Sequence, residues 1–397
     1  MTDLREVVIC SPLRTPVGRL GGSLAPLAPL SARALGVAVL EALVSRSGLD
    51  VDAVDSVIAA QGYPSMESPA FGRVAALDAG FPITTTGYQL DRRCGSGLQA
   101  VMNAAMEVQT GVAEVVVALG AESMSNAPLY TEQGRRGTPP AGLMLHDALA
   151  RGRETVGGVN YPSPDGNVGS AELLRSEYGI SREAQDRFAL QSHQRAVAAQ
   201  ESGAFDAELI PVTVPGRKGD VVIDRDEHPR ADSSLEALTR LRPILGKKDP
   251  ASTVTAGNSS GQNDAAAACI VTTPSRAAAL GLTPSVRLVS WAVAGNNPRL
   301  FGVAPVPATV LTLSRAGLGL DDRDVIELNE AFAVQVLACL ADWGIDAEAP
   351  RLNPRGSGIS SCSTCSRRPS PTPGSARPSA RSWPRSSPPS CRTGSVQ

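Results

Sequence analysis

Aromatic side chains, net charge and long apolar runs are all scarce in this chain of 397 residues. Phe, Trp and Tyr together make up 4%, too few for a surface on which nucleic-acid bases stack. The 37 Lys and Arg nearly balance the 39 Asp and Glu, a net charge of -2, so nucleic acid and anionic membranes are not expected as partners. No apolar run reaches the roughly 18 residues that a membrane-spanning helix needs.

Hydrophobic residues make up 42% of the chain and charged residues 19%, a composition typical of folded domains with large cores. At roughly 150 residues per domain, the length predicts two to three domains. The seven cysteines are mostly isolated, which favours a reduced, cytoplasmic protein over a disulfide scaffold. The first residues carry two acids and lead directly into an apolar run, so we expect no signal peptide.

Short apolar runs alternate with longer helix-like segments over the first 360 residues. This alternation predicts a layered α/β fold with mostly parallel sheets. The predicted buried strands are Val7–Cys10, Val57–Ala60, Val115–Leu119, Ile270–Thr273, Val286–Ala292 and Val325–Leu328. The predicted helices are Ala32–Ser47, Ser96–Thr110, Ser181–Gly203 and Pro307–Arg315.

Two features suggest a duplicated core that carries an insertion. Residues 48–58 resemble residues 317–326, since each segment follows a predicted helix, has Asp at a turn and enters a β-branched strand. Connections from helix to strand reuse such turns, so this single match also fits coincidence. Between Glu122 and about Ser252, Gly, Pro, Tyr and charged residues dominate, with one clear helix that opens at Ser181. Such a segment is typical of an insertion that shapes a binding surface.

Cys94 is the strongest candidate for a chemical role. It precedes Gly95 and Gly97, which allow a tight turn, and a run of good helix formers. At a helix N-terminus the partial positive charge stabilises a thiolate, and unpaired N–H groups bind a developing oxyanion. We therefore expect a lowered pKa for this thiol, with a buried structural role as the alternative. The structural role is expected for the cysteines in apolar surroundings, namely Cys10, Cys269 and Cys339.

Three further stretches extend the pattern around Cys94. Residues 254–268 form a polar, glycine-bearing loop that runs into small residues. Residues 327–333 place an amide and a carboxylate at the end of a predicted buried strand, where α/β folds build sites. Together with residues 14–18 and the turn at Cys94, these stretches resemble the thiolase family (acetyl-CoA acetyltransferase and 3-ketoacyl-CoA thiolase) in family order. Residues 180–196 resemble the insertion of that family.

The resemblance implies a thiolase-like, five-layered α/β fold of two similar βαβαβαββ halves, with an inserted loop domain that holds coenzyme A. It assigns residues 1–121 and 251–275 to the N-terminal half, 122–250 to the CoA-binding loop domain and 276–360 to a truncated C-terminal half. It also implies a cytoplasmic homodimer or homotetramer in fatty acid metabolism such as β-oxidation. Acyl-CoA and CoA would be its substrates, with no separate cofactor and no metal.

The chemistry implied by the resemblance is formation or cleavage of 3-ketoacyl-CoA, either acetoacetyl-CoA or longer. Cys94 matches the nucleophile that takes the acyl group as a thioester, which divides one difficult carbon–carbon step into two acyl transfers. Its backbone N–H would belong to the second oxyanion hole. Asn329 matches the residue that holds a water in the first oxyanion hole, Phe332 lines that pocket, and Ser260 matches a serine near the pantetheine chain.

The sequence departs from the family near its end. Thiolases carry a His in a Gly-His-Pro motif and a second Cys in a Cys-x-Gly-Gly-Gly motif, which move protons during the reaction. Residues 353–360 resemble the approach to the first motif, but the histidines all lie earlier, at His146, His193 and His228. No glycine triplet follows the last cysteines, Cys362, Cys365 and Cys391. Loss of one oxyanion donor alone costs roughly 10²–10³ in rate, so we expect little turnover. A catalytically impaired CoA-binding protein is the alternative function.

Composition changes abruptly at the same place. Residues 361–397 contain 11 Ser, 7 Pro and 6 Arg, and no Asp, Glu or Lys. This change is typical of GC-rich coding DNA read in a shifted frame, and a divergent, disordered tail is the alternative. The Cys-x-x-Cys spacing at 362–365 stands alone and does not predict a metal or redox site. Loss of the last helix and strands of the second half would uncover a sheet edge and destabilise the chain.

Two residues of the insertion, His146 and Asn167, are candidates for the acyl pocket. Asn167 lies where many thiolases have a His-Met pair. An ordinary loop role is the alternative for both, because acyl-chain length depends on how the insertion closes over the pocket.

Overall fold

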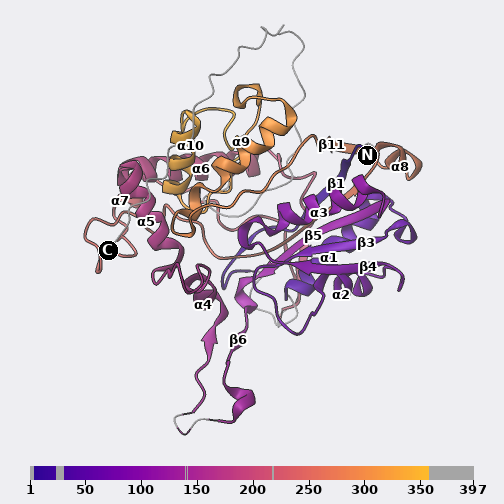
Figure 1. The fold of residues 1–397 in the computed structure, drawn as a ribbon, viewed down its shortest axis with the longest axis horizontal. Helices are drawn as coiled ribbons and strands as arrows, with labels where there is room; N and C mark the ends of the chain where they lie inside the picture. The colour runs from indigo at the N-terminus through magenta and orange to yellow at the C-terminus, as the bar shows by residue number, and fades with distance from the viewer. Residues whose placement is uncertain (1–3, 24–30, 139, 141, 217–218, 357–397) are drawn as a thin grey trace, which may run out of the picture. The chain divides into compact units, whose positions relative to one another are not determined.

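The computed structural model describes residues 4–23, 31–138, 140, 142–216 and 219–356. A seven-stranded mixed sheet forms the centre of the first half (Figure 1). Its strands lie in the order β11-β1-β10-β5-β3-β4, and β2 pairs with β10. Their bounds are β1 Val8–Arg14, β2 Gly18–Arg19, β3 Ser56–Ala60, β4 Thr86–Leu90, β5 Val115–Ser123, β10 Asn263–Thr272 and β11 Pro284–Arg287.

Three helices cover the two faces of this sheet. Helices α1 (Ala32–Ser47) and α2 (Phe71–Asp78) pack on one face, and α3 (Ser96–Thr110) packs on the other. The period of two along β3 divides its buried side chains between the faces. Val57 and Ala59 therefore lie in the cluster under α1 and α2. Ile58 and Ala60, which alternate with them along β3, lie in the cluster under α3.

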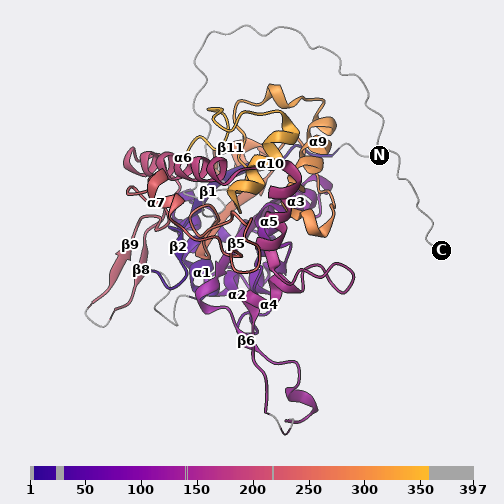
Figure 2. The same ribbon diagram turned by 90° about the vertical axis from the view of Figure 1, so that its left-hand side faces the viewer.

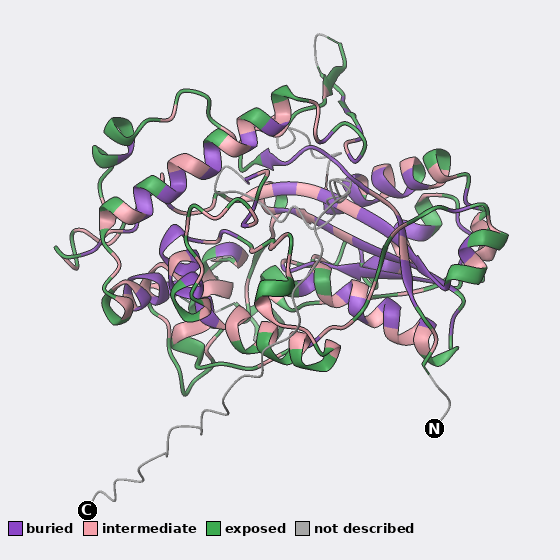
Figure 3. Ribbon diagram, turned by 90° about the horizontal axis from the view of Figure 1, so that it is seen from above, coloured by how far each residue is buried: buried purple, intermediate pink, exposed green. Residues whose placement is uncertain are grey.

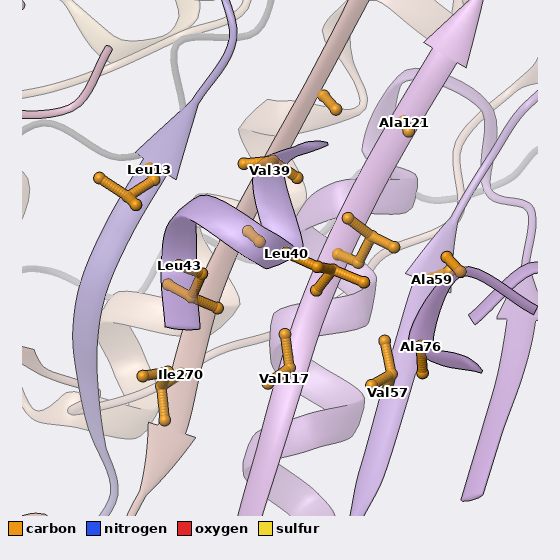
Figure 4. Packing of buried hydrophobic residues seen from close by; sticks show 14 of the residues in the cluster. Leu13, Val39, Leu40, Leu43, Val57, Ala59, Ala76, Val117, Ala121 and Ile270 are labelled. Carbon is orange, nitrogen blue, oxygen red and sulfur yellow. The ribbon is translucent and has the colours of Figure 1, made fainter. Parts of the chain in front are cut away.

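The core under α1 is closely packed. Leu40 and Leu43 lie over β5 and β10 at Val117 and Ile270, and all four side chains are fully buried (Figure 4). Strands β3, β5 and β10 are buried along most of their length, whereas β4 and β11 at the two edges have no buried residue (Figure 3). A Cβ at position 36 would lie 2.9 Å from the ring of Phe71, so glycine there allows α1 to approach α2. Burial of such side chains stabilises the sheet by roughly 1.5–3 kcal/mol each.

The order of these elements is βαβαβαββ: β1, α1, β3, α2, β4, α3, β5 and, after a long insertion, β10. Strands β3, β4 and β5 are mutually parallel, whereas β10 is antiparallel to both β5 and β1. Four of the predicted strands lie in β1, β3, β5 and β10, and the helices predicted at Ala32–Ser47 and Ser96–Thr110 have those bounds. The predicted α/β alternation is confirmed for this half, but the expectation of a mostly parallel sheet is wrong. Of the described pairings in this sheet, those of β3 with β4 and β5 are parallel, whereas β10 is antiparallel to β1, β2 and β5, and β11 is antiparallel to β1.

The segment between β5 and β10 is richer in helix than the sequence predicted. Its longest helix, α6, begins after Ser181, whose Oγ accepts a hydrogen bond from the Ala184 N–H (3.1 Å) as expected of an N-cap. The expectation of a single clear helix is wrong, because α5 also forms and buries Leu174 in a cluster with α10. The segment that carries β6 extends away from the sheet in both views (Figures 1 and 2). The elements are η3 Met124–Asn126, β6 Leu129–Tyr130, η4 Gly134–Arg136, β7 His146–Asp147, α4 Ala148–Glu154, α5 Gly166–Tyr178, α6 Arg182–Glu201, β8 Val212–Val214, β9 Val221–Ile223 and α7 Leu235–Thr239.

After β10 the chain is mainly helical. Helix α10 is buried on two sides, in one cluster with α5 and in another with α6. The predicted helix Pro307–Arg315 lies within α9. None of the helices in the described ranges is long and apolar enough to cross a membrane. The elements are α8 Pro274–Ala279, η5 Pro298–Val303, α9 Pro305–Ala316, η6 Leu320–Asp322 and α10 Ala333–Trp343.

The two matching segments of the sequence repeat fold alike at first. Gly48 (φ 67°) and Gly317 (φ 66°) end α1 and α9 in the left-handed conformation that glycine adopts without strain. Each glycine is followed by a short 3₁₀ turn that contains Asp, η1 (Val51–Ala53) after the first and η6 after the second. The segments then diverge, because the first enters β3 and the second forms only a bridge between Ile326 and Leu352.

Two strand predictions for the second half are therefore wrong in extent. The strand expected at Val286–Ala292 ends at Arg287, and it lies at the edge of the first sheet beside β1. The strand expected at Val325–Leu328 is reduced to the bridge at Ile326. A strand needs partners on its flanks, and residues 361–397 contain one Val and no Leu, Ile or Phe from which a partner could form. The tail itself, including Cys362, Cys365 and Cys391, lies outside the described residues.

The repeat offers a matched test of this difference. Backbone amides of residues 56–60, paired on both sides, should exchange with solvent at least about 100-fold more slowly than those of residues 325–328. The reason is that residues 325–328 are released by local separation from residues 351–353. Hydrogen exchange followed by mass spectrometry measures both segments in one sample. Equal protection would show that the second segment is held by a sheet of its own.

Candidate active site

Cys94 lies in a turn that joins β4 to α3. The turn contains the 3₁₀ helix η2 (Arg93–Gly95), and Gly95 is the N-cap of α3. Cys94 is exposed, whereas Cys10, Cys269 and Cys339 are buried as expected. The purely structural alternative for Cys94 is therefore wrong, because solvent reaches the residue.

The parallel strands bring three loops together around this turn. In parallel pairs the carboxyl ends of strands meet at the same edge of the sheet. Gly62 follows β3, Cys94 follows β4, and Glu122 lies near the end of β5, so all three occupy one edge. The site is therefore placed by sheet topology and not by neighbouring sequence.

Arg93 holds the turn in an unusual backbone conformation. Its φ of 51° lies in the left-handed region, which is strained for a side chain of this kind. Its guanidinium donates to the carbonyl oxygens of Gly62 and of Gly152 in α4, the latter at 3.1 Å, and lies 5.0 Å from the centre of the Tyr63 ring. The hydroxyl of Ser96 adds a local clamp, since it accepts from the Arg92 N–H and donates to the Arg93 carbonyl, both at 2.7 Å. Strain at Arg93 is thus offset by bonds to three segments.

The pKa of the Cys94 thiol is raised above its ordinary value of 9.0, so the expected lowering is wrong. Desolvation by the protein atoms around the sulfur is the largest cause. Three influences act the other way: a hydrogen bond from the N–H of Cys94 itself and the positive charges of Arg93 and Arg153. These groups favour the thiolate but do not outweigh the desolvation.

Glu122 is a buried carboxylate that the sequence analysis did not single out. Its Oε2 accepts hydrogen bonds from the backbone N–H groups of Gly62 (2.6 Å) and Tyr63 (3.3 Å), while its Oε1 is buried without a partner. Burial raises the pKa of Glu122 to about 7 despite these bonds. Its position at the end of a buried strand is a signal that could have identified it.

Ser260, Phe332 and Asn329 lie on two loops that pair with one another. The Ser260 N–H donates to the Ala331 carbonyl (2.9 Å), and Ser259 forms a β-bridge with Phe332. Phe332 is buried in the apolar cluster of α5 and α10, and its place in a pocket wall stays a prediction. Asn329 is exposed, which leaves its amide accessible.

Asn353 binds the residues on both sides of Asn329, the backbone of Leu328 and the side chain of Glu330. Its Oδ1 accepts from the Leu328 N–H (2.7 Å), and its Nδ2 donates to the Leu328 carbonyl (2.8 Å) and to Glu330 Oε1 (2.7 Å). Ser192 of α6 donates to the other oxygen of Glu330 (2.5 Å). The sequence analysis missed Asn353, because its partners lie more than twenty residues away.

Within the described ranges, no hydrogen bond or ion pair joins Cys94 to Asn329, Ser260 or Phe332. Arg153 of α4 links the two groups of residues instead, because its charge acts on the Cys94 thiol and its guanidinium binds Gln262, two residues after Ser260. With its amide oxygen turned toward this guanidinium, Gln262 accepts from Nη2 at 2.8 Å and Nη1 at 3.0 Å. Arg153 was also missed, because a single basic residue in a segment with several Arg residues does not by itself indicate a binding site.

In the described part of the chain, no hydrogen bond, ion pair or ring contact joins Cys94 to His146, Asn167 or His193. His146 is in β7 and contacts the ring of Tyr130 at a centroid distance of 5.6 Å, on the segment that extends from the sheet. Asn167 is the second residue of α5 and follows Gly166, where a Cβ would lie 3.2 Å from Cβ of Arg153. Burial lowers the pKa of His193 to about 4. No cluster of three metal-ligating side chains occurs among the residues that the structure describes.

Alkylation of Cys94 should follow its raised pKa. The rate constant for iodoacetamide should rise about tenfold per pH unit through pH 8, with a midpoint above 9.0, since only the thiolate reacts. Peptide mass spectrometry separates Cys94 from the other cysteines. Arg93→Met should slow the reaction further because it removes a charge that stabilises the thiolate, and a midpoint below 8 in the unmodified chain would contradict the expectation.

Glu122→Gln should change how stability depends on pH. The pKa of Glu122 in the folded chain, about 7, lies above its ordinary 4.5, so its contribution is fully present below pH 4.5 and is lost as pH rises to 7. The unmodified chain should therefore lose up to about 3 kcal/mol of unfolding free energy relative to Glu122→Gln over this range. Denaturant unfolding at several pH values measures the difference. Glu132→Gln, at an exposed position of the insertion, is the matched control and should show no such trend.

Comparison with known proteins places this arrangement in a family. The sequence matches the families Thiolase, N-terminal domain over residues 7–275 and Thiolase, C-terminal domain over residues 282–362. The Beta-ketothiolase BktB of Cupriavidus necator is 42% identical over 358 residues, which cover 90% of this chain and 88% of that protein. The Beta-ketoadipyl-CoA thiolase of Pseudomonas aeruginosa is 41% identical over 368 residues, covering 89% and 88%.

The fold agrees with solved structures. The crystal structure of the Bacillus anthracis acetyl-CoA acetyltransferase superposes with a TM-score of 0.84 at 39% identity, covering 90% of this chain and 88% of that one. The fold class expected from the sequence is confirmed, and the catalytically silent alternative is not favoured by relatives that carry enzyme names. The chain belongs to the thiolase family and is an acyltransferase of the thiolase type.

Proposed function

We propose that Cys94 Sγ is the acyl acceptor in the formation or cleavage of 3-ketoacyl-CoA. The observation that carries the proposal is the place of Cys94, an exposed residue of the turn before α3, at the edge of the sheet where three loops meet and next to Arg93, which ties this turn to Gly62 and Gly152. The thiolate attacks the thioester carbonyl, the bond to the CoA sulfur breaks, and the CoA thiolate leaves. The Cys94 N–H faces the sulfur and supports the proposed second oxyanion hole.

The remaining site residues take the roles that the family resemblance implies. Asn329 would hold a water against the substrate carbonyl, Phe332 would line that pocket, and Ser260 would lie along the pantetheine chain. The pairing of their two loops and the clamp from Asn353 on Leu328 support a shared pocket. CoA enters as a substrate, and we propose no resident cofactor or metal.

We also propose that the protein acts as a homodimer or homotetramer. In the described part of the chain, β4 is an edge strand, and its outer N–H and C=O groups face no other strand. A second copy of β4 would cover that edge. The segment around β6 and β7 exposes large apolar side chains, including Leu129, Met144 and Leu145 at 60% or more, which supports a further contact between copies.

A cytoplasmic location and a role in fatty acid metabolism are part of the proposal. The four described cysteines are free thiols, which supports a reducing compartment. Cleavage of the 3-ketoacyl chain by CoA, as in β-oxidation, is the downhill direction, whereas condensation is uphill.

Acyl transfer to Cys94 tests the proposed function. Incubation with acetyl-CoA should add one acetyl group at Cys94, and Cys94→Ser should remove the label. Steady turnover should be low, since the chain has no His after His228 to take the proton and no Cys-x-Gly-Gly-Gly motif. A chain whose reading frame is restored near codon 360 is the positive control, and it should turn over at least about 100-fold faster. Labelling that survives Cys94→Ser would contradict the assignment.

A further inference from the structure

Arg153 stands apart from the other charged groups around Cys94. Arg93 donates to two carbonyl oxygens and lies 3.5 Å from a carboxylate oxygen of Asp91. Arg153 is half-buried, and its partner is the neutral amide of Gln262, with the amide oxygen turned toward the guanidinium. No carboxylate among the described residues lies within ion-pair distance of its guanidinium. A guanidinium without a carboxylate partner keeps its charge and its N–H donors available to an anion that binds there.

The position of Arg153 is fixed by two contacts of its helix. The carbonyl of Gly152, the preceding residue, accepts from Arg93, and Arg93 precedes Cys94 in the chain. This bond keeps α4 beside the turn that presents the thiol. On the other side, Gly166 at the start of α5 brings its backbone close to Cβ of Arg153, in a left-handed conformation (φ 54°) that glycine permits. Gln262 then orients both terminal nitrogens of the guanidinium.

We propose that Arg153 binds a carboxylate at the far end of the acyl group, so that the chain prefers ω-carboxyacyl-CoA thioesters over neutral ones of equal length. This proposal rests on the function proposed for Cys94. A planar guanidinium donates two parallel hydrogen bonds to a carboxylate, which gives both charge and geometric selectivity. The covalent step is the one proposed above. The Cys94 thiolate forms a thioester with the ω-carboxyacyl group, the bond to the CoA sulfur breaks, and CoA leaves as the thiolate.

The acyl group is a better match for this site than the phosphates of CoA. In the acyl-enzyme the acyl chain is attached to Cys94 Sγ, so its far end lies within a few bonds of the sulfur. The diphosphate of CoA is separated from the reacting thioester by the whole pantetheine arm. Arg153 follows Gly152, whose carbonyl is bonded to the residue before Cys94, and is therefore placed to meet the acyl chain.

Acylation of Cys94 by succinyl-CoA and butyryl-CoA tests the proposal, because both acyl groups have four carbons and only the first ends in a carboxylate. The full chain should react faster with succinyl-CoA. Arg153→Gln should lower the ratio of the two rates about tenfold, since it removes a charge-assisted pair of hydrogen bonds. Arg153→Lys, which keeps the charge without the planar fork, should lower the ratio less. Arg151→Gln, in the same helix and paired with Glu154, is the matched control and should leave the ratio unchanged.

Three results would overturn the inference in different ways. An unchanged ratio in Arg153→Gln would show that no carboxylate binds there. An equal fall in both rate constants would assign Arg153 to stabilisation of the thiolate alone, and an equal rise in both half-saturation concentrations would assign it to CoA. Failure of both esters to acylate Cys94 would overturn the proposed function, and this inference with it.

Discussion

The side chain of Arg93 connects the three segments on which the active-site turn depends. It donates to Gly62 after β3 and to Gly152 in α4, and it lies over the ring of Tyr63. Its own backbone is left-handed, a conformation that persists only where surrounding bonds outweigh the strain. Glu122 supports the same arrangement from β5, because its carboxylate receives the N–H groups of Gly62 and Tyr63. Arg93 therefore joins the loop after β3, helix α4 of the insertion and the turn that carries Cys94.

The chemistry of the site follows from the balance between desolvation and charge. The atoms around Cys94 remove water from its sulfur and raise the thiol pKa, while Arg93 and Arg153 act in the opposite direction. A thiol in this state needs a base to give up its proton near neutral pH. The thiolate fraction at neutral pH therefore depends on such a base as well as on the two guanidinium groups.

The second half shows which structural features form from neighbouring residues alone, without strand partners from distant segments. Gly317 and η6 reproduce the cap and turn of Gly48 and η1, because both depend on residues a few positions apart. The strand that should follow does not extend beyond the bridge at Ile326. In the first half the equivalent strand, β3, lies between β4 and β5, and those neighbours make it a strand.

The sequence by itself determined the alternation of strands and helices in the first half, the bounds of α1 and α3, the start of α6 at Ser181, and the family to which the residues around Cys94 point. These depend on period, on capping residues and on short motifs, which act over a few positions of chain. Only the tertiary structure decided the raised pKa of Cys94, the contacts of Glu122 and Arg153, and the shortened strands of the second half. Each of these depends on groups brought together from distant segments, since desolvation, ion pairing and strand pairing are properties of neighbours in space.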